Sequence, residues 1–408
     1  MKILYVSQFF KPERVAAAFR AYDNADIWRK RGHDVTIFTG YPNFPTGKLF
    51  EGYNIEMLKN DTVDGIKVLR SRILIKENTN KINRVINSVS FLFFGLYNII
   101  FNKRKIGDDY DVVLGTSGTI LAPIIAYVFS LINKIPFVLE IRDITYVQML
   151  AVYNGKKTIL YKLVKFIELF LCKKANKIVV VTNGFKRELI EAGIESNKIE
   201  VIHNGVDTNK IERSSYNSSE EIVFSYMGNI GASQNLINII NIFNAISIDK
   251  YSKKLIIIGD GAKKDEIKEY IKNNNFKNII IKDGMQPEEL EEYYKISDFC
   301  IVSLNNNEFF KNTIPSKIFQ IMGRGKNIIY FGPEGEASSI ISNVDDALIF
   351  TEETFDCIVG KINKFINERV GLKEYLYKRG EKFIEVVVTN YDRNNLAEKY
   401  EKILLDLC

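Results

Sequence analysis

A glycine-containing segment at residues 228–231 has the residue types of a phosphate-binding turn. The sequence Gly228-Asn229-Ile230-Gly231 follows a predicted strand and opens a predicted helix. Two glycines allow the backbone to approach a phosphate closely, and the free N–H groups at a helix start attract anions. The segment lacks the Gly-x-Gly-x-x-Gly spacing, which argues against a nicotinamide cofactor. Gly259 stands in a second short turn, Gly259-Asp260-Gly261, for which an ordinary tight turn is the simpler interpretation.

A second group of candidate residues begins at Pro315. Pro315 and Ser316 are helix start signals and predict a helix over residues 315–323. Lys317 then lies in the first turn, where a cation is unfavourable unless an anion binds nearby. Gln320, one turn further on, projects close to it. Contact between Lys317 and a phosphate is one interpretation and an ordinary surface lysine is the alternative; we favour phosphate contact only together with the family resemblance given below.

Charged residues in the first half of the chain offer further candidates. Arg142 and Asp143 end a predicted strand, and ligands of doubly wound sheets bind beyond the carboxyl ends of the strands. A structural ion pair is the alternative for these two residues. Asp109 and Asp111 form an Asp-x-Asp pattern, but it precedes its strand and lies at the opposite edge, so we expect no metal there. His33 occupies a turn and is expected to be structural.

The elements that position these residues alternate along the chain. Apolar strands alternate with helical stretches up to about residue 200, and the alternation restarts at residue 222. This pattern is typical of βαβ crossovers and a mostly parallel sheet. The polar, Ser- and Asn-rich stretch 200–219 separates the two halves. We therefore expect two Rossmann-like doubly wound domains, at residues 1–200 and 201–390, facing a central cleft that would be the default ligand site. A final amphipathic helix at 391–408 is expected to cross back onto the first domain.

Composition sets bounds on the class of protein. The chain has 408 residues, of which 46% are apolar and 26% charged, as expected for a folded globular protein. The net charge of +6 is modest and no nucleic-acid motif accompanies it, so we expect no nucleic-acid partner. The four cysteines are widely spaced and fit a reducing compartment, and the amino terminus does not resemble a signal peptide. The uncharged stretch 112–133 is interpreted as strand, turn and helix rather than as a membrane span.

Two basic and apolar segments raise the possibility of membrane contact. Residues 81–106 form an aromatic block bracketed by cations, and residues 156–174 combine terminal lysines with apolar residues at helical spacing. Both could lie on an anionic membrane surface. Two amphipathic helices packed on a sheet, with their lysines extended toward water, explain the same pattern. Both interpretations stand on the sequence alone, and a cytoplasmic protein that can bind the inner face of the cell membrane is the expected location.

Nearly the whole chain resembles the family 4 glycosyltransferases of the GT-B fold, closest to their WbuB-like and colanic-acid-type bacterial branch. The resemblance is carried by the order and spacing of several segments: ILYVSQFFKPE with Arg20, residues 32–53, EIRD at 140–143, HNGVD at 203–207, YMGNIGASQNL at 226–236, IIGDG at 257–261 and PSKIFQIMGRGK at 315–326. It implies transfer of a sugar from a nucleotide diphosphate donor with retention of anomeric configuration. It also implies that no metal cofactor is needed, because protein cations and helix ends neutralise the leaving diphosphate.

The resemblance also assigns roles to residues. It implies that Gly228 and Gly231 lie near the diphosphate. It also implies that Asn229 and Gln234 replace the Arg and Lys of many relatives, and that Lys317 supplies the cation for the diphosphate in their place. Gly259 and the Pro315-Ser316 pair join this donor-binding set. Gly284 and Met285 fall where relatives contact the nucleobase. Arg142 and Asp143 match a catalytic pair near the reacting sugar, with Arg14 and Arg20 on the acceptor side.

Two departures from the family pattern affect the expected affinity. Relatives usually have Glu at the position of Gln320, where it accepts hydrogen bonds from ribose hydroxyls, and Gln accepts them without charge assistance. Val15-Ala16-Ala17-Ala18 replaces a glycine-rich loop, which narrows the room for an acceptor phosphate.

Three functional hypotheses follow. The first is a retaining transferase that moves a sugar, an N-acetylated or deoxy hexose, from a UDP-linked donor to a lipid-linked or glycan acceptor in surface polysaccharide biosynthesis. UDP is expected because it is the commonest carrier in the family. A nucleotide-sugar 2-epimerase of the same architecture is the second, although no matching His and carboxylate set is evident. The third is a non-catalytic relative that binds sugar nucleotides, which Gln320, Asn229 and Gln234 motivate.

Overall fold

The computed structural model describes residues 1–77, 81–153, 155–213, 216 and 218–408. The chain divides into two compact units, the first made of Met1–His203 with Asn394–Cys408 and the second of Asn204–Arg393. The sequence placed the corresponding boundaries at 200/201 and 390/391. Each unit is described by itself below.

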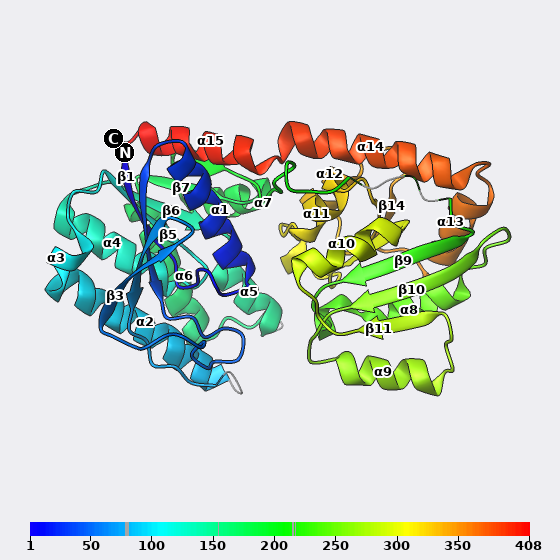
Figure 1. The fold of residues 1–408 in the computed structure, drawn as a ribbon, viewed down its shortest axis with the longest axis horizontal. Helices are drawn as coiled ribbons and strands as arrows, with labels where there is room; N and C mark the ends of the chain where they lie inside the picture. The colour runs from blue at the N-terminus through cyan, green and yellow to red at the C-terminus, as the bar shows by residue number, and fades with distance from the viewer. Residues whose placement is uncertain (78–80, 154, 214–215, 217) are drawn as a thin grey trace. The chain divides into compact units, whose positions relative to one another are not determined.

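The first unit is built on a sheet of buried strands (Figure 1). Within its described residues the order is β3-β4-β2-β1-β5-β6-β7-β8, and all neighbours are parallel except β3 and β4. The central strands are buried on both sides, as expected where helices cover both faces of a parallel sheet. The strands are β1 (Lys2–Val6), β2 (Asp34–Gly40), β3 (Leu58–Val63), β4 (Ile66–Ser71), β5 (Val112–Thr116), β6 (Phe137–Ile141), β7 (Lys177–Val180) and β8 (Ile199–Val201).

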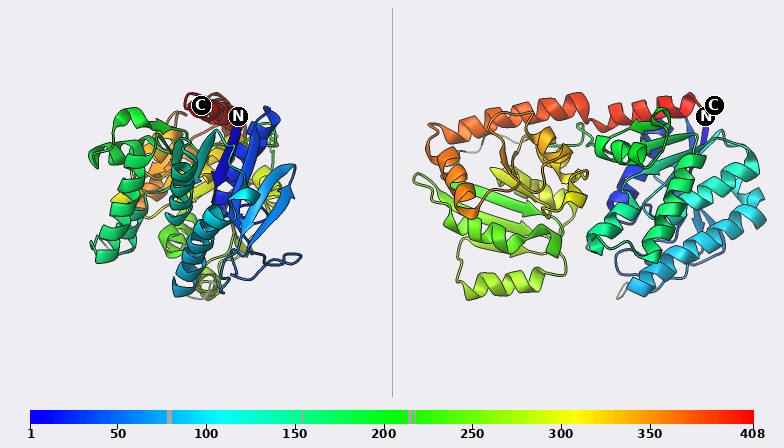
Figure 2. Two further views of the ribbon diagram at one scale, coloured as in Figure 1. Left: turned by 90° about the vertical axis from the view of Figure 1, so that its left-hand side faces the viewer. Right: turned by 180° about the vertical axis from the view of Figure 1, so that it is seen from behind.

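Helices cover both faces of this sheet. Strand residues such as Leu4 and Val113 pack with α2, α4 and α6 in one core cluster, whereas Tyr5 and Leu114 pack with α1 and α15 in another. The right-hand view in Figure 2 shows α2, α4 and α6 side by side on the first face. The helices are α1 (Ala16–Lys30), α2 (Lys81–Phe101), α3 (Lys103–Ile106), α4 (Leu121–Asn133), α5 (Thr145–Val152), α6 (Ile159–Lys174), α7 (Asn183–Glu191) and α15 (Arg393–Leu405), with a 3-10 turn η1 (Ser196–Lys198).

The last helix, α15, completes the first unit rather than the second. The Trp28 indole N–H donates to the Ala397 carbonyl at 3.0 Å, and its ring packs edge-on against Tyr400. His33 contacts Glu401 with its Nε2 2.5 Å from Oε1. The two chain ends consequently lie side by side (Figures 1 and 2). His33 thus has a structural partner, as its place in a turn predicts.

The second unit repeats the architecture with a parallel sheet. In its described residues the strand order is β11-β10-β9-β12-β13-β14. The strands are β9 (Glu221–Met227), β10 (Ser252–Ile258), β11 (Ile279–Lys282), β12 (Phe299–Ser303), β13 (Asn327–Phe331) and β14 (Leu348–Phe350). The parallel sheets in both units confirm the predicted α/β class with two Rossmann-like domains.

Two helical layers enclose the second sheet. The core cluster on one face includes α8, α9, α13 and the start of α14, and the cluster on the other includes α10, α11, α12 and the end of α14. The helices are α8 (Leu236–Ala245), α9 (Lys264–Asn273), α10 (Pro287–Ile296), α11 (Lys317–Gly323), α12 (Glu336–Ile341), α13 (Phe355–Asn367) and α14 (Leu372–Asn390), with 3-10 turns η2 (Ala232–Gln234) and η3 (Glu308–Phe310).

Each sheet has one point where the strand order changes direction. In the first unit it lies between β1 and β5, and in the second between β9 and β12. At such a point the loops that leave the two strands diverge to opposite faces, which opens a crevice at the carboxyl edge. The loops after β1, β5, β9 and β12 are therefore the places to examine for a binding site.

Candidate nucleotide-sugar site

The loop after β9 is folded back on itself by side chains that the sequence identified. Gln234 Oε1 accepts the Gly231 backbone N–H at 3.1 Å, and Asn229 Nδ2 lies 3.4 Å from the same oxygen. The Tyr226 hydroxyl donates to the Asn229 carbonyl at 2.7 Å. The Ile230 N–H donates to the Asp260 carbonyl, which joins this loop to the loop after β10. Asn229 and Gln234, which stand where many relatives carry cations, thus shape the loop themselves.

Lys317, from the start of α11, lies against this loop. Its Nζ is 4.5 Å from the centre of the Tyr226 ring, a cation–π contact. A Cβ atom added to Gly228 would lie 2.5 Å from the same Nζ, so the missing side chain at residue 228 is what admits the ammonium group. Gly228 also has φ +151°, which favours glycine. Tertiary structure therefore brings together the two motifs that the sequence predicted separately.

The Lys317 ammonium is poorly neutralised by the protein. In the described part of the chain it forms no ion pair or hydrogen bond, and burial lowers the pKa of Lys317 to about 8. A desolvated cation without an anionic partner is costly, and a bound anion removes that cost. The loop glycines and the free cation together form a site suited to a diphosphate.

We expect donor affinity to fall as the pH rises through 8. The free protein loses the Lys317 charge above its pKa, whereas a bound diphosphate stabilises that charge and raises the pKa. Binding of UDP at pH 8 should therefore take up about half a proton, because a group at its pKa is half protonated. Calorimetric titrations in two buffers of different ionisation enthalpy measure this uptake. The uptake should vanish in Lys317→Arg, because arginine stays protonated at this pH; uptake unchanged in that variant would assign the proton to another group.

The loops after β10 and β11 extend the site along neighbouring strands. Gly259, with φ +158°, packs so closely on the Gly228 carbonyl that any Cβ would collide with it. Asp260 accepts the Gly284 N–H at 3.1 Å. Met285, next to Gly284, lies partly buried against the core cluster that contains Tyr294. Gly259, Gly284 and Met285 thus follow adjacent strands, and a nucleobase contact at 284–285 stays a prediction.

Gln320 has a protein partner that the sequence did not reveal. Its Oε1 accepts from Arg324 Nη1 at 2.9 Å, and Arg324 Nε donates to Glu291 Oε2 at 2.9 Å. The Arg324 guanidinium also lies over the Tyr294 ring, 4.5 Å from its centre. The carbonyl oxygen expected to accept from a ribose hydroxyl is therefore already hydrogen-bonded to Arg324.

The Gln320→Glu variant should bind the donor more tightly. A carboxylate has two acceptor oxygens, so one can keep the Arg324 bond while the other accepts from a sugar hydroxyl with charge assistance. The gain should be about 1 kcal/mol, close to fivefold in Kd. Calorimetric titration with UDP tests it, with Asn343→Asp, exposed ahead of β14, as a charge-matched control. Weaker binding in Gln320→Glu would contradict this prediction, and unchanged binding would show that residue 320 does not contact the donor.

Pro315 and Ser316 precede the helix that the sequence assigned to 315–323. The helix begins at Lys317, and Ser316 occupies the N-cap position without a side-chain hydrogen bond to the first turn. The predicted start was therefore two residues early. The Ser316 backbone is already helical at φ −58° and ψ −23°, which leaves its hydroxyl exposed instead of capping.

In the first unit, Arg142 lies at the carboxyl end of β6, as predicted. Its backbone N–H donates to Ser117 Oγ at 3.0 Å, which ties it to the loop after β5. Its Nε and Nη1 are buried and have no hydrogen-bond partner among the described residues. Burial and the charge of Arg20 lower the pKa of Arg142, and burial raises the pKa of Asp143 to about 6. Such unpartnered guanidinium donors are expected where an anionic ligand completes a site.

The two predicted acceptor-side arginines have different surroundings. Arg20 is 7% exposed, and its Nε donates to the fully buried Glu140 at 2.8 Å. It also donates to the carbonyls of Ile202 and His203, and Glu140 accepts from the Tyr5 hydroxyl at 2.7 Å. Arg14 is exposed and forms no ion pair in the described chain. Arg20 therefore holds the interior of the unit together, whereas Arg14 remains available to a ligand.

Glu13 is a residue at this edge that the sequence prediction missed. Its carboxylate accepts backbone N–H groups of Asn43 and Phe44, both at 3.0 Å, and so links the loops after β1 and β2. Burial raises the pKa of Glu13 to about 7, against the opposing effect of these hydrogen bonds. An acidic residue directly after a proline in a loop was the available signal, but it did not show which backbone groups the carboxylate would meet.

Other polar clusters lie away from the carboxyl edges. Asp109 pairs with the Lys2 ammonium, and Asp111 accepts the Lys2 backbone N–H at 2.6 Å, at the amino ends of β1 and β5. Within the described residues no group of three or more His, Cys, Asp or Glu side chains could hold a metal ion.

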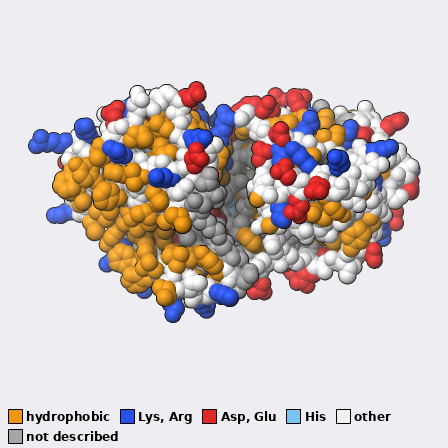
Figure 3. Space-filling model, turned by 90° about the horizontal axis from the view of Figure 1, so that it is seen from below, with side chains coloured by type: hydrophobic (Ala, Val, Ile, Leu, Met, Phe, Trp, Pro, Cys, Tyr) orange, Lys and Arg blue, Asp and Glu red, His pale blue; other side chains and the backbone are white. Residues whose placement is uncertain are grey.

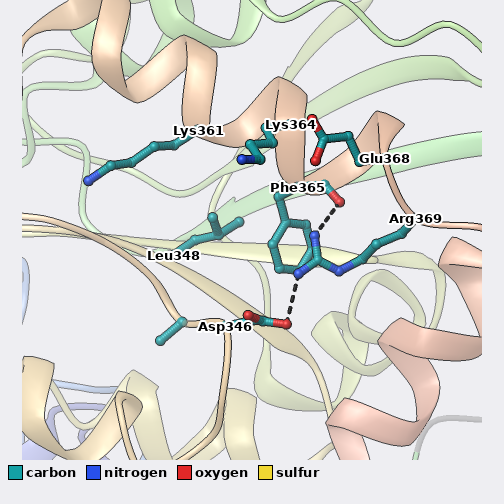
Figure 4. Close-up of a pocket in the computed structure, with 8 residues that line it drawn as sticks. Asp346, Leu348, Lys361, Lys364, Phe365, Glu368 and Arg369 are labelled. Carbon is teal, nitrogen blue, oxygen red and sulfur yellow. Dashed lines mark hydrogen bonds and ion pairs between the residues drawn. The ribbon is translucent and has the colours of Figure 1, made fainter.

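A shallow pocket of about 520 Å³ lies near the amino end of β14 (Figure 4). There Arg369 stacks on Phe365 and pairs with Asp346 at 2.7 Å. Its position opposite the carboxyl edge separates it from the candidate donor site.

Comparison with protein-family models identifies both halves of the chain. The model described as Glycosyltransferase Family 4 matches residues 17–210, and the model described as Glycosyl transferases group 1 matches residues 207–383. No curated protein sequence matches the chain. The candidate donor residues fall within the second match, and Arg142 and Arg20 within the first.

Solved structures with this fold include several sugar transferases. Sucrose-phosphate synthase from Thermosynechococcus elongatus aligns with a TM-score of 0.75 at 12% identity, over 100% of this chain and 98% of the other. Anabaena HepE in complex with UDP-glucose aligns with a TM-score of 0.68 at 15% identity, over 100% of both chains. The lipopolysaccharide outer core galactosyltransferase WaaB aligns with a TM-score of 0.61 at 13% identity, over 98% and 100% of the two chains. At these identities the likeness shows the fold.

Proposed function

We propose that the chain, a glycosyltransferase of the GT-B fold, acts as a family 4 enzyme that moves a sugar from a UDP-linked donor to a lipid-linked or glycan acceptor with retention of anomeric configuration. The observation that carries the donor half of this proposal is Lys317 lying against the Gly228 loop. The second unit holds the donor and the first unit holds the acceptor.

In this proposal, Lys317 and the peptide N–H groups of the loop after β9 stabilise the leaving UDP. Negative charge develops on the diphosphate as the bond to the sugar breaks, and a prearranged cation lowers the energy of that state most. The protein cation fills the role that a divalent ion has in other transferases, so we propose that transfer is metal-independent. The UDP assignment draws on HepE, which is described in complex with UDP and UDP-glucose.

The acceptor half of the proposal depends on Arg142. Its buried Nε and Nη1 lack partners in the described chain, and the nearby Asp143 has a pKa raised to about 6 by burial. A phosphate or diphosphate of a lipid-linked sugar satisfies such donors, and Arg14 adds an exposed cation. WaaB and WaaG, described as enzymes of lipopolysaccharide biosynthesis, support a surface polysaccharide as the product. The transferred sugar is proposed to be an N-acetylated or deoxy hexose.

A non-catalytic protein that binds sugar nucleotides is the second candidate. The hydrogen bond from Arg324 to Gln320 favours it, because one of the two lone pairs of the oxygen that would accept from the donor ribose is already used. Slow hydrolysis of the donor distinguishes a transferase from a binding protein, because a transferase usually transfers some sugar from the donor to water and a binding protein does not.

A donor screen followed by product analysis tests the proposal. Thermal shifts are measured with UDP-, GDP- and ADP-sugars, and the best donor is then incubated with extracted lipid-linked acceptors and analysed by mass spectrometry. We expect stabilisation by a UDP-sugar, a product heavier by one sugar, and an unchanged rate in EDTA. Stabilisation by GDP- or ADP-sugars alone would exclude UDP, and a rate abolished by EDTA would exclude the metal-independent mechanism.

A further inference from the structure

The helix α2 buries several polar side chains together with Phe91 and Ile99, and exposes a second stripe of apolar side chains. Asn87, Ser90 and Asn98 are buried and hydrogen-bond the preceding chain: Asn87 with Lys76, Ser90 with Leu74, and Asn98 with Met57. An ordinary surface helix exposes its polar side chains instead. The outward apolar side chains recur at spacings of one helical turn: Ile82, Val85, Val89, Phe93, Tyr97, Ile100 and Phe101.

The helix α6 also combines a buried polar residue with an exposed apolar stripe, although Tyr161, Leu171 and Cys172 are buried beside that polar residue. Glu168 is buried and its carboxylate accepts the Thr145 and Tyr146 backbone N–H groups, which caps the start of α5. The apolar residues Ile159 and Phe166 are 86% and 69% exposed, and Leu160, Leu163 and Phe170 accompany them. The inner face of α6 therefore contains a charged residue that caps α5, whereas its outer face is apolar.

These two outer faces belong to one surface. The helix α4 packs between α2 and α6, and its exposed Leu131 and Ile132 extend the apolar area. Figure 3 shows hydrophobic side chains gathered over this unit, on the left of the view, with cations around them. We call this surface the apolar face. An apolar area of this extent on a folded protein indicates an interaction site.

The exposed charged side chains of α6 and of the α4 C-cap are cations, and α3 adds Arg104 and Lys105; two exposed acids, Asp108 and Asp109, follow α3. The described part of α2 contains no acidic residue, and the one acid of α6, Glu168, is buried. Exposed cations lie at both ends of the helices: Arg104, Lys105, Lys134, Lys156, Lys157, Lys162, Lys173 and Lys174.

None of the described helices of the chain is long and apolar enough to cross a membrane.

We propose that the apolar face docks on an anionic lipid surface, with α2 and α6 lying in the interfacial plane. Apolar side chains enter the boundary between headgroups and acyl chains, and the surrounding lysines meet the lipid phosphates. A second copy of the chain fits less well, because a symmetric pairing would set cationic rims against each other. The inference rests on the apolar face alone, although it would bring the first unit to the lipid-linked acceptor of the proposed function.

Vesicle binding of the full chain tests the proposal. Co-sedimentation is compared between phosphatidylcholine vesicles and vesicles of three parts phosphatidylcholine to one part phosphatidylglycerol, at low and high salt. We expect binding to the anionic vesicles that weakens as salt rises. The partition coefficient should fall at least about tenfold in either of two variant sets. The apolar set is Val89→Gln, Phe93→Gln, Ile100→Gln and Phe166→Gln; the charge set is Lys156→Gln, Lys157→Gln and Lys162→Gln.

Matched controls keep the test specific. Val370→Gln and Val388→Gln remove exposed apolar residues, and Lys378→Gln and Lys382→Gln remove exposed cations, in the second unit. These controls should bind vesicles like the natural sequence. The altered residues are exposed, so each variant should keep the melting temperature of the natural sequence. A measured melting temperature therefore shows whether a variant is folded.

Two outcomes would overturn the proposal. Equal binding by the variant sets and the controls would remove the apolar face from the interaction. A dimer in light scattering that is lost in the apolar set, together with no vesicle binding, would assign the face to a second copy of the chain. UDP binding, measured in parallel, separates the two proposals: vesicle binding without UDP binding would leave the lipid surface standing and contradict the donor assignment.

Discussion

Replacing Lys317 by alanine is expected to lower the rate of sugar transfer at least about a hundredfold. The Lys317 ammonium lies against the Gly228 loop, unpaired within the described chain, where charge would develop on the leaving diphosphate. Its removal takes away stabilisation that is strongest in the transition state, so kcat should fall more than donor affinity. Steady-state kinetics with saturating donor measure the loss.

Stability measurements distinguish this catalytic effect from misfolding. Because burial lowers the pKa of Lys317, the charged lysine is not a source of folding stability, and Lys317→Ala should melt at or above the temperature of the natural protein. Lys378→Ala, on the exposed side of α14, is the matched control and should keep full activity. A rate for Lys317→Ala within a few fold of the natural protein would mean that another group neutralises the diphosphate.

The Arg20→Met variant is expected to lose stability rather than acceptor affinity alone. Arg20 and Glu140 form a buried ion pair with side chains 9% and 0% exposed, and removing one partner leaves a buried charge uncompensated. Such a loss costs about 3 to 5 kcal/mol of the free energy of unfolding. Chemical denaturation monitored by circular dichroism measures this loss, as a change in the unfolding transition of the first unit.

Two comparisons define what Arg20 does. Arg14→Met removes an exposed cation and should change the free energy of unfolding by less than about 0.5 kcal/mol. The double variant Arg20→Met with Glu140→Gln should recover part of the lost stability, because it removes the uncompensated carboxylate. If Arg20→Met were as stable as the natural protein and lost only acceptor binding, the acceptor-side role that the family resemblance implied would be the correct one.

The strand assignments show how far local pattern reaches. Short buried apolar runs separated by helical stretches predicted the central strands of both sheets, since a strand covered on both faces must be apolar throughout. Three edge strands were not predicted: β3 (Leu58–Val63) is largely polar and partly exposed, and β8 and β14 have only three residues each. The Asp64-Gly65 pair before β4 was a usable sequence signal, because Asp-Gly favours a two-residue hairpin turn. In the structure both residues have the positive φ that this turn requires.

The candidate site was predictable in its parts but not in its contacts. Residue types and start signals predicted the Gly228 turn and Lys317 as anion-binding elements, because glycine and helix-end preferences act locally; anion binding itself stays a prediction. The pairing of Arg324 with Glu291 joins α11 to α10, and the pairing of Arg20 with Glu140 joins α1 to β6; no local preference encodes these two contacts.

By itself the sequence determined the alternation of elements and the α/β class, and it predicted which residues could bind a diphosphate. Only the tertiary structure decided that Lys317 meets Gly228, that Arg20 pairs with Glu140 in the interior, and that α2 buries polar side chains and exposes an apolar stripe. Periodicity shows that a helix has two unlike faces, but which face is buried depends on the groups of the protein against which the helix packs. For α2 those groups include backbone groups of residues 74–76, which Asn87 and Ser90 satisfy and an apolar side chain could not.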